Sequence, residues 1–247
     1  MRLENRAVSD VQGTILMHNV ADAQGKRTLK KGIRLEREHL AQLAESGRST
    51  VEVAVLEADD VHEDDAVLAL AEAMQTEGLF HSRPAGGRVN LRTTLDGLLE
   101  VDAERLIAVN MLPGFALATR RQHTVLGPGQ DTDNVATLKI VPYAVGRSDL
   151  DRALEWASAR PGIIEVRSFQ QGRRVAMLFV AEESAQERTR NQYLPPTQAR
   201  LAPLGASVVA IEAVGQDEAA IAGTAAKLAS EADLLIIAGQ TSVIHED

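Results

Sequence analysis

Apolar and polar residues alternate in short blocks over the first half of the chain, and the blocks predict a mixture of strands and helices. Some blocks have the alternating pattern of half-buried strands, and others repeat apolar residues at the helical period, as amphipathic helices do. Pro142 lies near the end of one predicted strand and indicates an edge strand or a bend there. The predicted strands are residues 14–19, 51–55 and 137–145, and the predicted helices are residues 37–46 and 67–74.

The pattern changes after Gly146, where longer apolar runs alternate with segments of helical spacing. The runs at residues 175–180, 207–212 and 234–238 are typical of parallel strands that helices cover on both sides. Asp217 precedes the helical segment between the last two runs and is a good N-cap. The pattern therefore predicts an α/β fold with a domain boundary near Gly146. The two predicted parts are residues 1–146 and 147–247.

Composition and charge narrow the possible partners. Aromatic residues make up 3% of the 247 residues, so a stacking surface for single-stranded nucleic acid is not expected. The formal net charge of −9 disfavours nucleic acid and anionic membranes as partners, although a local group of amides can still bind a small anion. The sequence shows neither a membrane-spanning apolar run nor a signal peptide. We therefore expect a cytoplasmic protein that binds neither nucleic acid nor a membrane.

The chain contains no cysteine, which excludes disulfides, thiolate catalysis and cysteine-ligated zinc. Its histidines form no pair with metal-ligand spacing. A small parallel sheet built from the apolar runs would leave two edges open, and exposed strand edges must be covered. A homo-oligomer is therefore expected.

The segment DLLIIAGQTSVIHED (233–247) is the first candidate for a binding site. Its apolar run ends at Gly239, and a glycine at the end of a parallel strand lets the backbone approach a ligand. Thr241 and Ser242 offer hydroxyl groups, and an acid four to six residues further on suits Mg²⁺ or a polar ring. An ordinary turn between a strand and a helix explains the same residues, because every parallel strand needs one.

Three further polar segments allow both a structural and a functional interpretation. VHEDDA (61–66) precedes an amphipathic helix, where acids complement the helix dipole, but clustered carboxylates also suit a hard metal ion. Lys30 and Lys31 precede Gly32 and can meet a phosphate, although two lysines at a turn are usually solvated. GPGQDTDN (127–134) is glycine-rich but lacks GxxxxGK[ST] and GxGxxG, so a solvated loop is the better interpretation.

The last segments resemble the molybdopterin-binding fold of molybdenum insertases, molybdopterin adenylyltransferases and gephyrin, the MoaB/Mog family. Residues 233–247 are similar to the family's strand followed by T-G-G-T-G-x-x-x-R-D, and VGQDEAAI (214–221) resembles its upstream V-x-D-D-x-x-x-I segment. Segments in the first half look like a subgroup in which an insertase-like leader precedes the Mog-type domain. They are KKGIRL (30–35), VHEDDA (61–66), GRVNLRTTLDGLL (87–99) and VATLKIVPYAV (135–145).

The resemblance implies both a fold and a ligand. The implied fold is α/β, with an N-terminal mixed α+β leader in residues 1–146 followed by a three-layer α/β/α parallel-sheet domain in residues 147–247. Relatives continue further, so we expect this domain to be incomplete at its C-terminus. The implied ligand is molybdopterin or adenylyl-molybdopterin in molybdenum cofactor biosynthesis, and the implied activity is that of a molybdopterin molybdenumtransferase or adenylyltransferase that uses Mg²⁺.

The same resemblance implies the site residues. Backbone amides at a turn from strand to helix favour an anion, and Mg²⁺ offsets the charge of phosphoanhydride chemistry. Asp217 and Asp247 are the implied catalytic acids, and Asp247 is the implied metal ligand. The implied ligand-binding residues are Gly239, Gln240, Thr241 and Ser242.

The chain departs from the family pattern at several site positions. Gln240 and Ser242 replace two motif glycines, which hinders close backbone approach, and Gln216 replaces the first of the two acids. AEESAQER (181–188) stands where relatives carry T-G-x-E. These replacements favour a molybdopterin carrier or sensor over an enzyme. A third interpretation, outside the family, is an unrelated α/β protein that binds a phosphate ligand.

Overall fold

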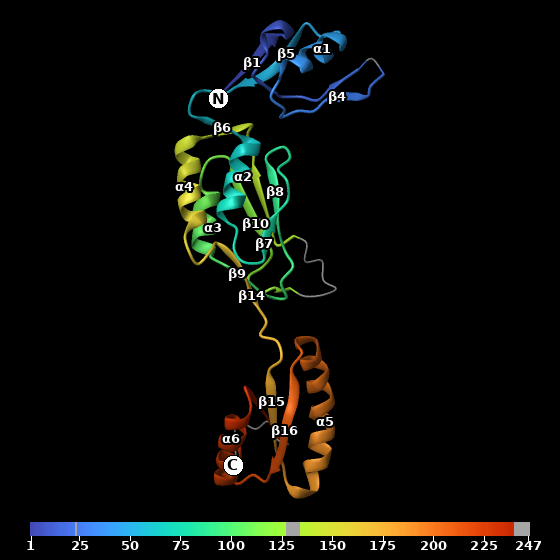
Figure 1. The fold of residues 1–247 in the computed structure, drawn as a ribbon, viewed down its shortest axis with the longest axis vertical. Helices are drawn as coiled ribbons and strands as arrows, with labels where there is room; N and C mark the ends of the chain where they lie inside the picture. Colours follow the sequence, from blue (N-terminus) through green and yellow to red (C-terminus); the bar gives the residue numbers. More distant parts are fainter. Residues whose placement is uncertain (23, 127–133, 240–247) are drawn as a thin grey trace, which may run out of the picture. The chain divides into compact units, whose positions relative to one another are not determined.

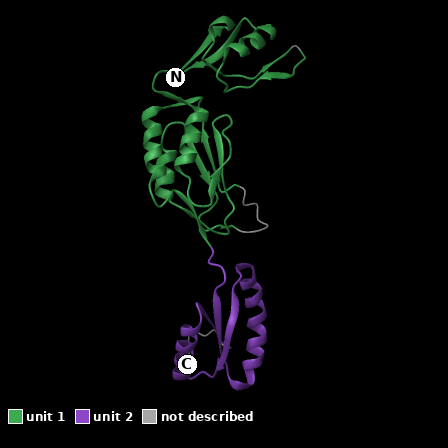
Figure 2. Ribbon diagram, viewed as in Figure 1, with its two compact units in different colours: residues 1–168 green, residues 169–247 purple. Residues whose placement is uncertain are grey.

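The computed structural model describes residues 1–22, 24–126 and 134–239. The chain divides into two compact units, residues 1–168 (unit 1) and 169–247 (unit 2), which Figure 2 colours separately. The predicted boundary near Gly146 lies inside unit 1, where the helix that follows this glycine joins the hydrophobic core through Leu150 and Ala153. Within the described part of the chain, no helix is long and apolar enough to cross a membrane.

Unit 1 begins with an N-terminal lobe (residues 1–55), an antiparallel sheet of order β1–β5–β2 with one helix against it (Figure 1). In β5, Val51 and Val53 are buried and Glu52 is exposed, because successive side chains of a strand face opposite sides. Leu43 brings helix α1 into the same core. The elements are β1 (Arg2–Ala7), η1 (Val8–Asp10), β2 (Ile15–Leu16), β3 (Val20–Ala21), β4 (Arg27–Leu29), α1 (Arg37–Glu45) and β5 (Thr50–Val55).

The rest of unit 1 is a central lobe (residues 56–168) around an antiparallel sheet of order β10–β12–β8–β7. Helix α2 packs against β8, β12 and α4, so its apolar stripe, including Val67 and Leu70, lies in the largest core. The first part of the lobe contains β6 (Asp60–His62), α2 (Glu63–Ala73), β7 (Leu79–His81), β8 (Arg88–Thr93), β9 (Gly97–Val101) and α3 (Ala103–Asn110). It continues with β10 (Phe115–Thr119), β11 (Val125–Leu126), β12 (Ala136–Ile140), β13 (Ala144–Gly146), α4 (Arg147–Ser158) and β14 (Ile164–Ser168).

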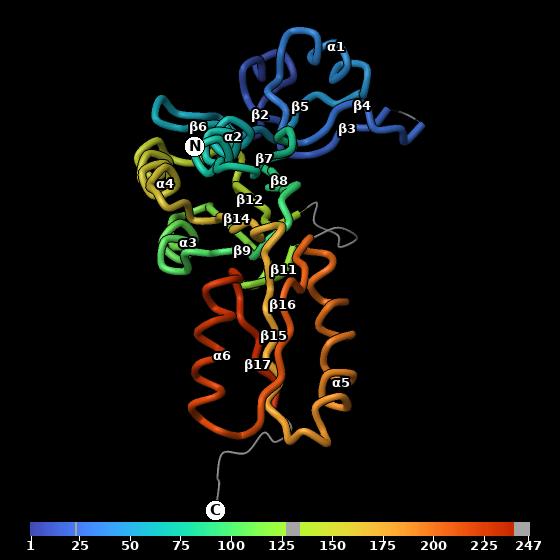
Figure 3. The backbone as a smooth tube through the Cα atoms, turned by 60° about the horizontal axis from the view of Figure 1, so that its bottom comes forward, coloured from blue at the N-terminus to red at the C-terminus, as the bar shows by residue number. Residues whose placement is uncertain are grey.

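Unit 2 is a small parallel sheet of order β16–β15–β17. Figures 1 and 3 show α5 and α6 on opposite sides of its strands. Ala176 and Leu178 on the central strand pack with Leu228 of α6, and Val175, Met177 and Phe179 of the same strand are also buried. The elements are β15 (Arg174–Val180), α5 (Glu183–Leu201), η2 (Ala202–Leu204), β16 (Ser207–Val214), α6 (Glu218–Glu231) and β17 (Leu234–Gly239).

The predicted fold class is wrong. The protein is mixed, with many short antiparallel strands in small sheets, and the parallel sheet of the described residues has three strands. An extended three-layer α/β/α domain over residues 147–247 is therefore not seen. The reason lies in the pairing of the strands. Strand β14 pairs antiparallel with β9, far away in sequence, and α4 packs into the core of unit 1, so residues 147–168 belong to unit 1 and not to the parallel sheet. A period-two pattern does not encode which partner a strand finds.

The helix ends follow local chemistry. His62 caps α2, its Nδ1 accepting the amide of Asp64 at 3.3 Å, and three acids fill the first turn, as the dipole argument predicts. Asp217 caps α6, as predicted. Helix α4 begins at Arg147. Helix α5 runs through Pro195 and Pro196, whose missing amides leave carbonyls on the exposed side of the helix, where water can bond them.

Candidate functional site

The carboxyl ends of the parallel strands form one candidate site. The chain passes from the central strand β15 to β16 on one side, and then across to β17 on the other. In sheets of this order, ligands bind outside the carboxyl ends of the first and third strands, where the direction of the connections reverses. The corresponding position here lies between the end of β15 at Val180 and the end of β17 at Gly239.

Two of the predicted site residues lie at this edge. Val180 pairs with Gly239 on one side and with Val214 on the other, so all three strands end at the same level. Asp217 follows β16 by a short turn and therefore lies at this edge too. The other predicted site residues, Gln240, Thr241, Ser242 and Asp247, lie outside the described residues.

Asp217 already has a structural task. Its Oδ1 accepts the backbone N–H of Ala220 at 2.7 Å, which satisfies one of the free amides at the start of α6. The second carboxylate oxygen has no bond within the described structure. Helix α5 starts at the same edge with Glu183 in its first turn, and α6 starts with Glu218. The amides of both helices attract an anion, while these acids oppose one.

A second candidate site lies in unit 1, where four segments distant in sequence meet around Glu63. This carboxylate is only 4% exposed, and its Oε2 lies 3.3 Å from Nζ of Lys139 on β12. Lys139 also donates to the carbonyl of Gly86. The pair thus connects the start of α2 to β12 and to the loop between β7 and β8.

Two glycines make room for the Glu63 carboxylate. A Cβ on Gly32 would lie 2.6 Å from Glu63 Oε1, and a Cβ on Gly87 would meet Glu63 Oε2 and lie 2.6 Å from the carbonyl oxygen of Ile140. Both glycines also have positive φ angles, +86° and +68°, which other residues rarely adopt. Burial raises the pKa of Glu63, and the positive charge of Lys139 only partly opposes this shift.

A cavity of about 290 Å³ lies beside this pair. Its walls come from the loop after β4, the start of α2 and the loop before β8. His62 Nε2 is 3.0 Å from the carbonyl oxygen of Gly32, and Asp64 Oδ1 accepts the N–H of Gly87 at 2.6 Å, so both loops are tied to α2. The lining residues are Lys30, Lys31, Gly32, Ile33, Arg34, His62, Asp64, Ala85 and Gly86.

Sequence reasoning found only part of this site. It singled out VHEDDA, but as first-turn acids or as a metal site, and it left Lys30 and Lys31 as usually solvated. Lys139 and Gly86 were missed, because a lysine inside an alternating strand and a glycine pair in a loop are ordinary features taken separately. Among the described residues, no group of three His, Asp or Glu side chains is placed to hold a metal ion.

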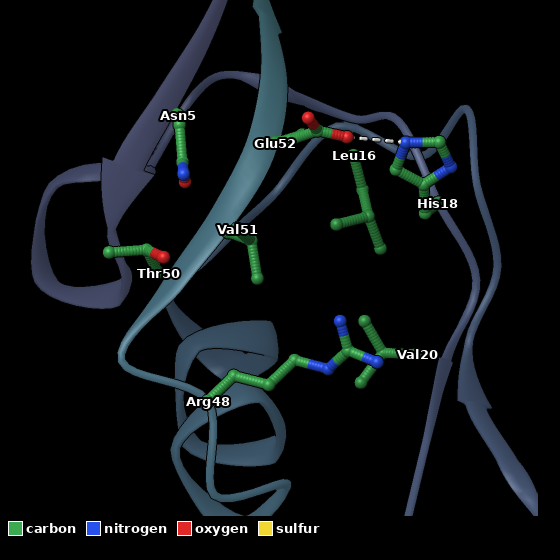
Figure 4. A pocket seen from close by; sticks show the side chains of 8 residues that line it. All are labelled: Asn5, Leu16, His18, Val20, Arg48, Thr50, Val51 and Glu52. Carbon is green, nitrogen blue, oxygen red and sulfur yellow. Dashed lines mark hydrogen bonds and ion pairs between the residues drawn. The ribbon is translucent and has the colours of Figure 1, made fainter.

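Figure 4 shows a further cavity in the N-terminal lobe, with a volume of about 230 Å³. His18 Nε2 and Glu52 Oε2 lie 2.6 Å apart on one side, and the Arg48 side chain reaches toward Val20 on the other. A single arginine and a carboxylate that already has a partner do not select a ligand class.

Comparisons with protein-family models, curated proteins and solved structures found no match for this chain. The segment GPGQDTDN lies outside the described residues except for Asn134. The resemblance to molybdopterin-binding proteins therefore rests on the residues quoted above.

Proposed function

We propose that this protein binds molybdopterin or adenylyl-molybdopterin in molybdenum cofactor biosynthesis. The resemblance of residues 214–221 and 233–247 to the family's two site segments suggests the ligand. The observation that carries the proposal is the strand order β16–β15–β17, because ligands bind at the edge where β16 ends at Val214 and β17 ends at Gly239, and these two residues belong to the two segments.

In this proposal the phosphate of molybdopterin contacts the backbone of Gly239, where the absence of a side chain allows close approach. Asp217 orders the start of α6 and has one carboxylate oxygen left for the ligand. Gln240, Thr241, Ser242 and Asp247 complete the proposed binding set. Mg²⁺ is implied by the family, and a carboxylate such as Asp247 would hold it; no step of the proposal depends on the metal.

The replacement of two motif glycines and of one motif acid favours binding without chemistry. The leading version is therefore a carrier or sensor of molybdopterin. The alternative is a molybdopterin adenylyltransferase, which would transfer AMP from ATP to the ligand phosphate and release pyrophosphate. A molybdenumtransferase would instead place molybdate on the dithiolene.

The direct test is a calorimetric titration of the full chain with molybdopterin. We expect saturable binding that Gly239→Asp weakens about tenfold or more, because it adds a negative charge and a side chain next to the phosphate. Ser207→Asp is the matched control, since it adds the same charge at the opposite, amino-terminal end of the strands. A folded chain that does not bind molybdopterin, or equal effects of the two substitutions, would exclude the proposal.

A second titration with ATP and Mg²⁺ separates the carrier from the enzyme. Pyrophosphate release that depends on molybdopterin, and that Asp247→Ala abolishes, would establish the adenylyltransferase. Molybdopterin binding without ATP turnover supports the carrier or sensor. Homo-oligomerisation remains part of the proposal, because β16 and β17 form the two edges of the sheet in the described residues.

A further inference from the structure

The cavity beside Glu63 has a positive charge that the protein as a whole lacks. Lys30, Lys31 and Arg34 line it, against the single carboxylate of Asp64, whose Oδ1 already accepts the Gly87 amide. Within the described residues, none of the three cations forms an ion pair. The formal net charge of the chain is −9, so the cavity is a local exception and not part of a generally basic surface.

Contacts within the protein hold the cavity walls in place. Glu63 lies against Gly32, which lines the cavity, and against Gly87, which follows the lining residue Gly86; it also pairs with Lys139. His62 adds a contact to the Gly32 carbonyl at 3.0 Å. A site that is already ordered loses little conformational entropy on binding, which favours affinity.

The exposed surface of the lining is mostly apolar. Ile33, Ala85 and the aliphatic stems of the lysines offer carbon surface beside the charged groups. The volume of about 290 Å³ is at the small end of ligand cavities. The cavity therefore suits a compact molecule with one strongly anionic group and a short carbon body.

We propose that this cavity binds the phosphate monoester of a small polar molecule. Lys30, Lys31 and Arg34 neutralise the dianionic phosphate, as lysine and arginine do in other phosphate sites, and Ile33 and Ala85 contact the carbon body. This cavity is built from residues of unit 1, whereas Gly239, proposed above to contact molybdopterin, belongs to unit 2.

The test is calorimetric titration of the full chain with ribose 5-phosphate, AMP and inorganic phosphate, with ribose as the uncharged control. We expect at least one of the two phosphate monoesters to bind more tightly than inorganic phosphate, and ribose not to bind. The double variant Lys30→Ala/Lys31→Ala should weaken that binding about tenfold or more, and added salt should weaken it in the wild type.

The matched control is Lys26→Ala/Arg27→Ala, which removes the same charge from the β3–β4 hairpin outside the cavity lining. It should bind like the wild type. Ala85→Glu, which places a carboxylate in the cavity, should abolish binding even if the lysine variant does not fold. Amide chemical-shift changes on titration should centre on residues 30–34 and 85–87.

Three results would overturn the proposal. They are a folded wild type that binds none of the three phosphates, a lysine variant that binds as well as the wild type, and equal losses in the lysine variant and its control. Gly239→Asp should leave the binding of these phosphates unchanged, although it weakens the binding of molybdopterin. The two proposals can therefore fail independently, and the experiments distinguish the two failures.

Discussion

Gly86 and Gly87 are neighbours in the loop before β8, yet they have different physical roles. Both have positive φ angles, +58° and +68°. A Cβ on Gly86 would meet nothing within 4 Å, whereas one on Gly87 would collide with Glu63 and with the carbonyl of Ile140. The first glycine is needed for its backbone conformation alone, and the second for both its conformation and its lack of volume.

Alanine substitutions should separate these two requirements. Gly86→Ala is expected to lower the free energy of unfolding by about 1–2 kcal/mol, the usual cost of a left-handed conformation for a residue with a Cβ. Gly87→Ala should cost roughly 1–3 kcal/mol more, because the Ile140 carbonyl belongs to the backbone of β12 and cannot turn away. Urea unfolding of both variants measures the difference, and equal losses would contradict the packing argument.

Glu63 should make stability depend on pH. Burial raises the pKa of its carboxyl above the usual value of 4.5. Below 4.5 both the folded and the unfolded chain hold the proton; between 4.5 and the raised pKa only the folded chain does. The contribution of this group to the free energy of unfolding therefore falls as the pH rises through that window, and the loss persists at higher pH.

Glu63→Gln should remove this contribution, so the wild type should lose stability relative to the variant as the pH rises from 4.5 to 7. Chemical unfolding at a series of pH values measures it. Asp65→Asn is the control for the loss of charge, because it removes a carboxylate from the same helical turn and leaves the ion pair of Glu63 with Lys139 in place. Parallel stability curves for the wild type and Glu63→Gln would refute the assignment.

At the scale of elements, α6 depends on one residue at its start. Its packing against β15 and β16 buries Leu228, while most of its other side chains remain exposed or half-buried. Burial therefore contributes less to this helix than to α2, which the central lobe covers on several sides. The Asp217 cap is correspondingly important for where the helix begins.

Asp217→Ala is expected to lower the free energy of unfolding of unit 2 by about 1 kcal/mol, the usual cost of losing an N-cap. Asp217→Asn keeps the acceptor oxygen and should be close to the wild type. Glu218→Ala is the control, since Glu218 lies in the same turn without accepting the Ala220 amide. If Asp217→Asn is as stable as the wild type but does not bind molybdopterin, the negative charge of the carboxylate is needed for ligand binding. If both Asp217 variants lose the same stability, Asp217 does not stabilise the helix as an N-cap.

For the whole molecule, the two units differ in how much they bury. The largest core runs through the central lobe, from Val61 to Val166. In unit 2 the buried side chains concentrate on the central strand, while Val209 and Ile237 on the neighbouring strands are 50% and 52% exposed. Apolar burial is the main favourable contribution to folding, so the units should differ in stability.

We expect unit 2 to lose structure first in denaturant. Amides of β15, β16 and β17 should exchange at lower urea concentrations than those of β8 and β12, because opening this sheet exposes less buried surface. Hydrogen exchange with mass spectrometry across a urea series measures the order. A single, simultaneous loss of protection in both units would show that they unfold as one.

Local pattern was enough for much of the secondary structure. The alternation at residues 51–55, the apolar stripe of α2 and the cap at Asp217 each depend on neighbours within a few positions, so the sequence alone predicts them. The pairing of β15, β16 and β17 in parallel also follows from long apolar runs between helices. These features need no knowledge of distant contacts.

The sheet partners and the cavity were decided by tertiary packing. The antiparallel pairing of β14 with β9 joins distant segments whose alternation is compatible with many partners. It places the first part of the predicted α/β/α domain in unit 1, and this is why the fold class was predicted wrongly. Glu63, Lys139, Gly32 and Gly87 are unremarkable separately and become a site only where folding brings them together. A buried charge needs a partner within a few ångströms, and only the folded chain determines which side chain that is.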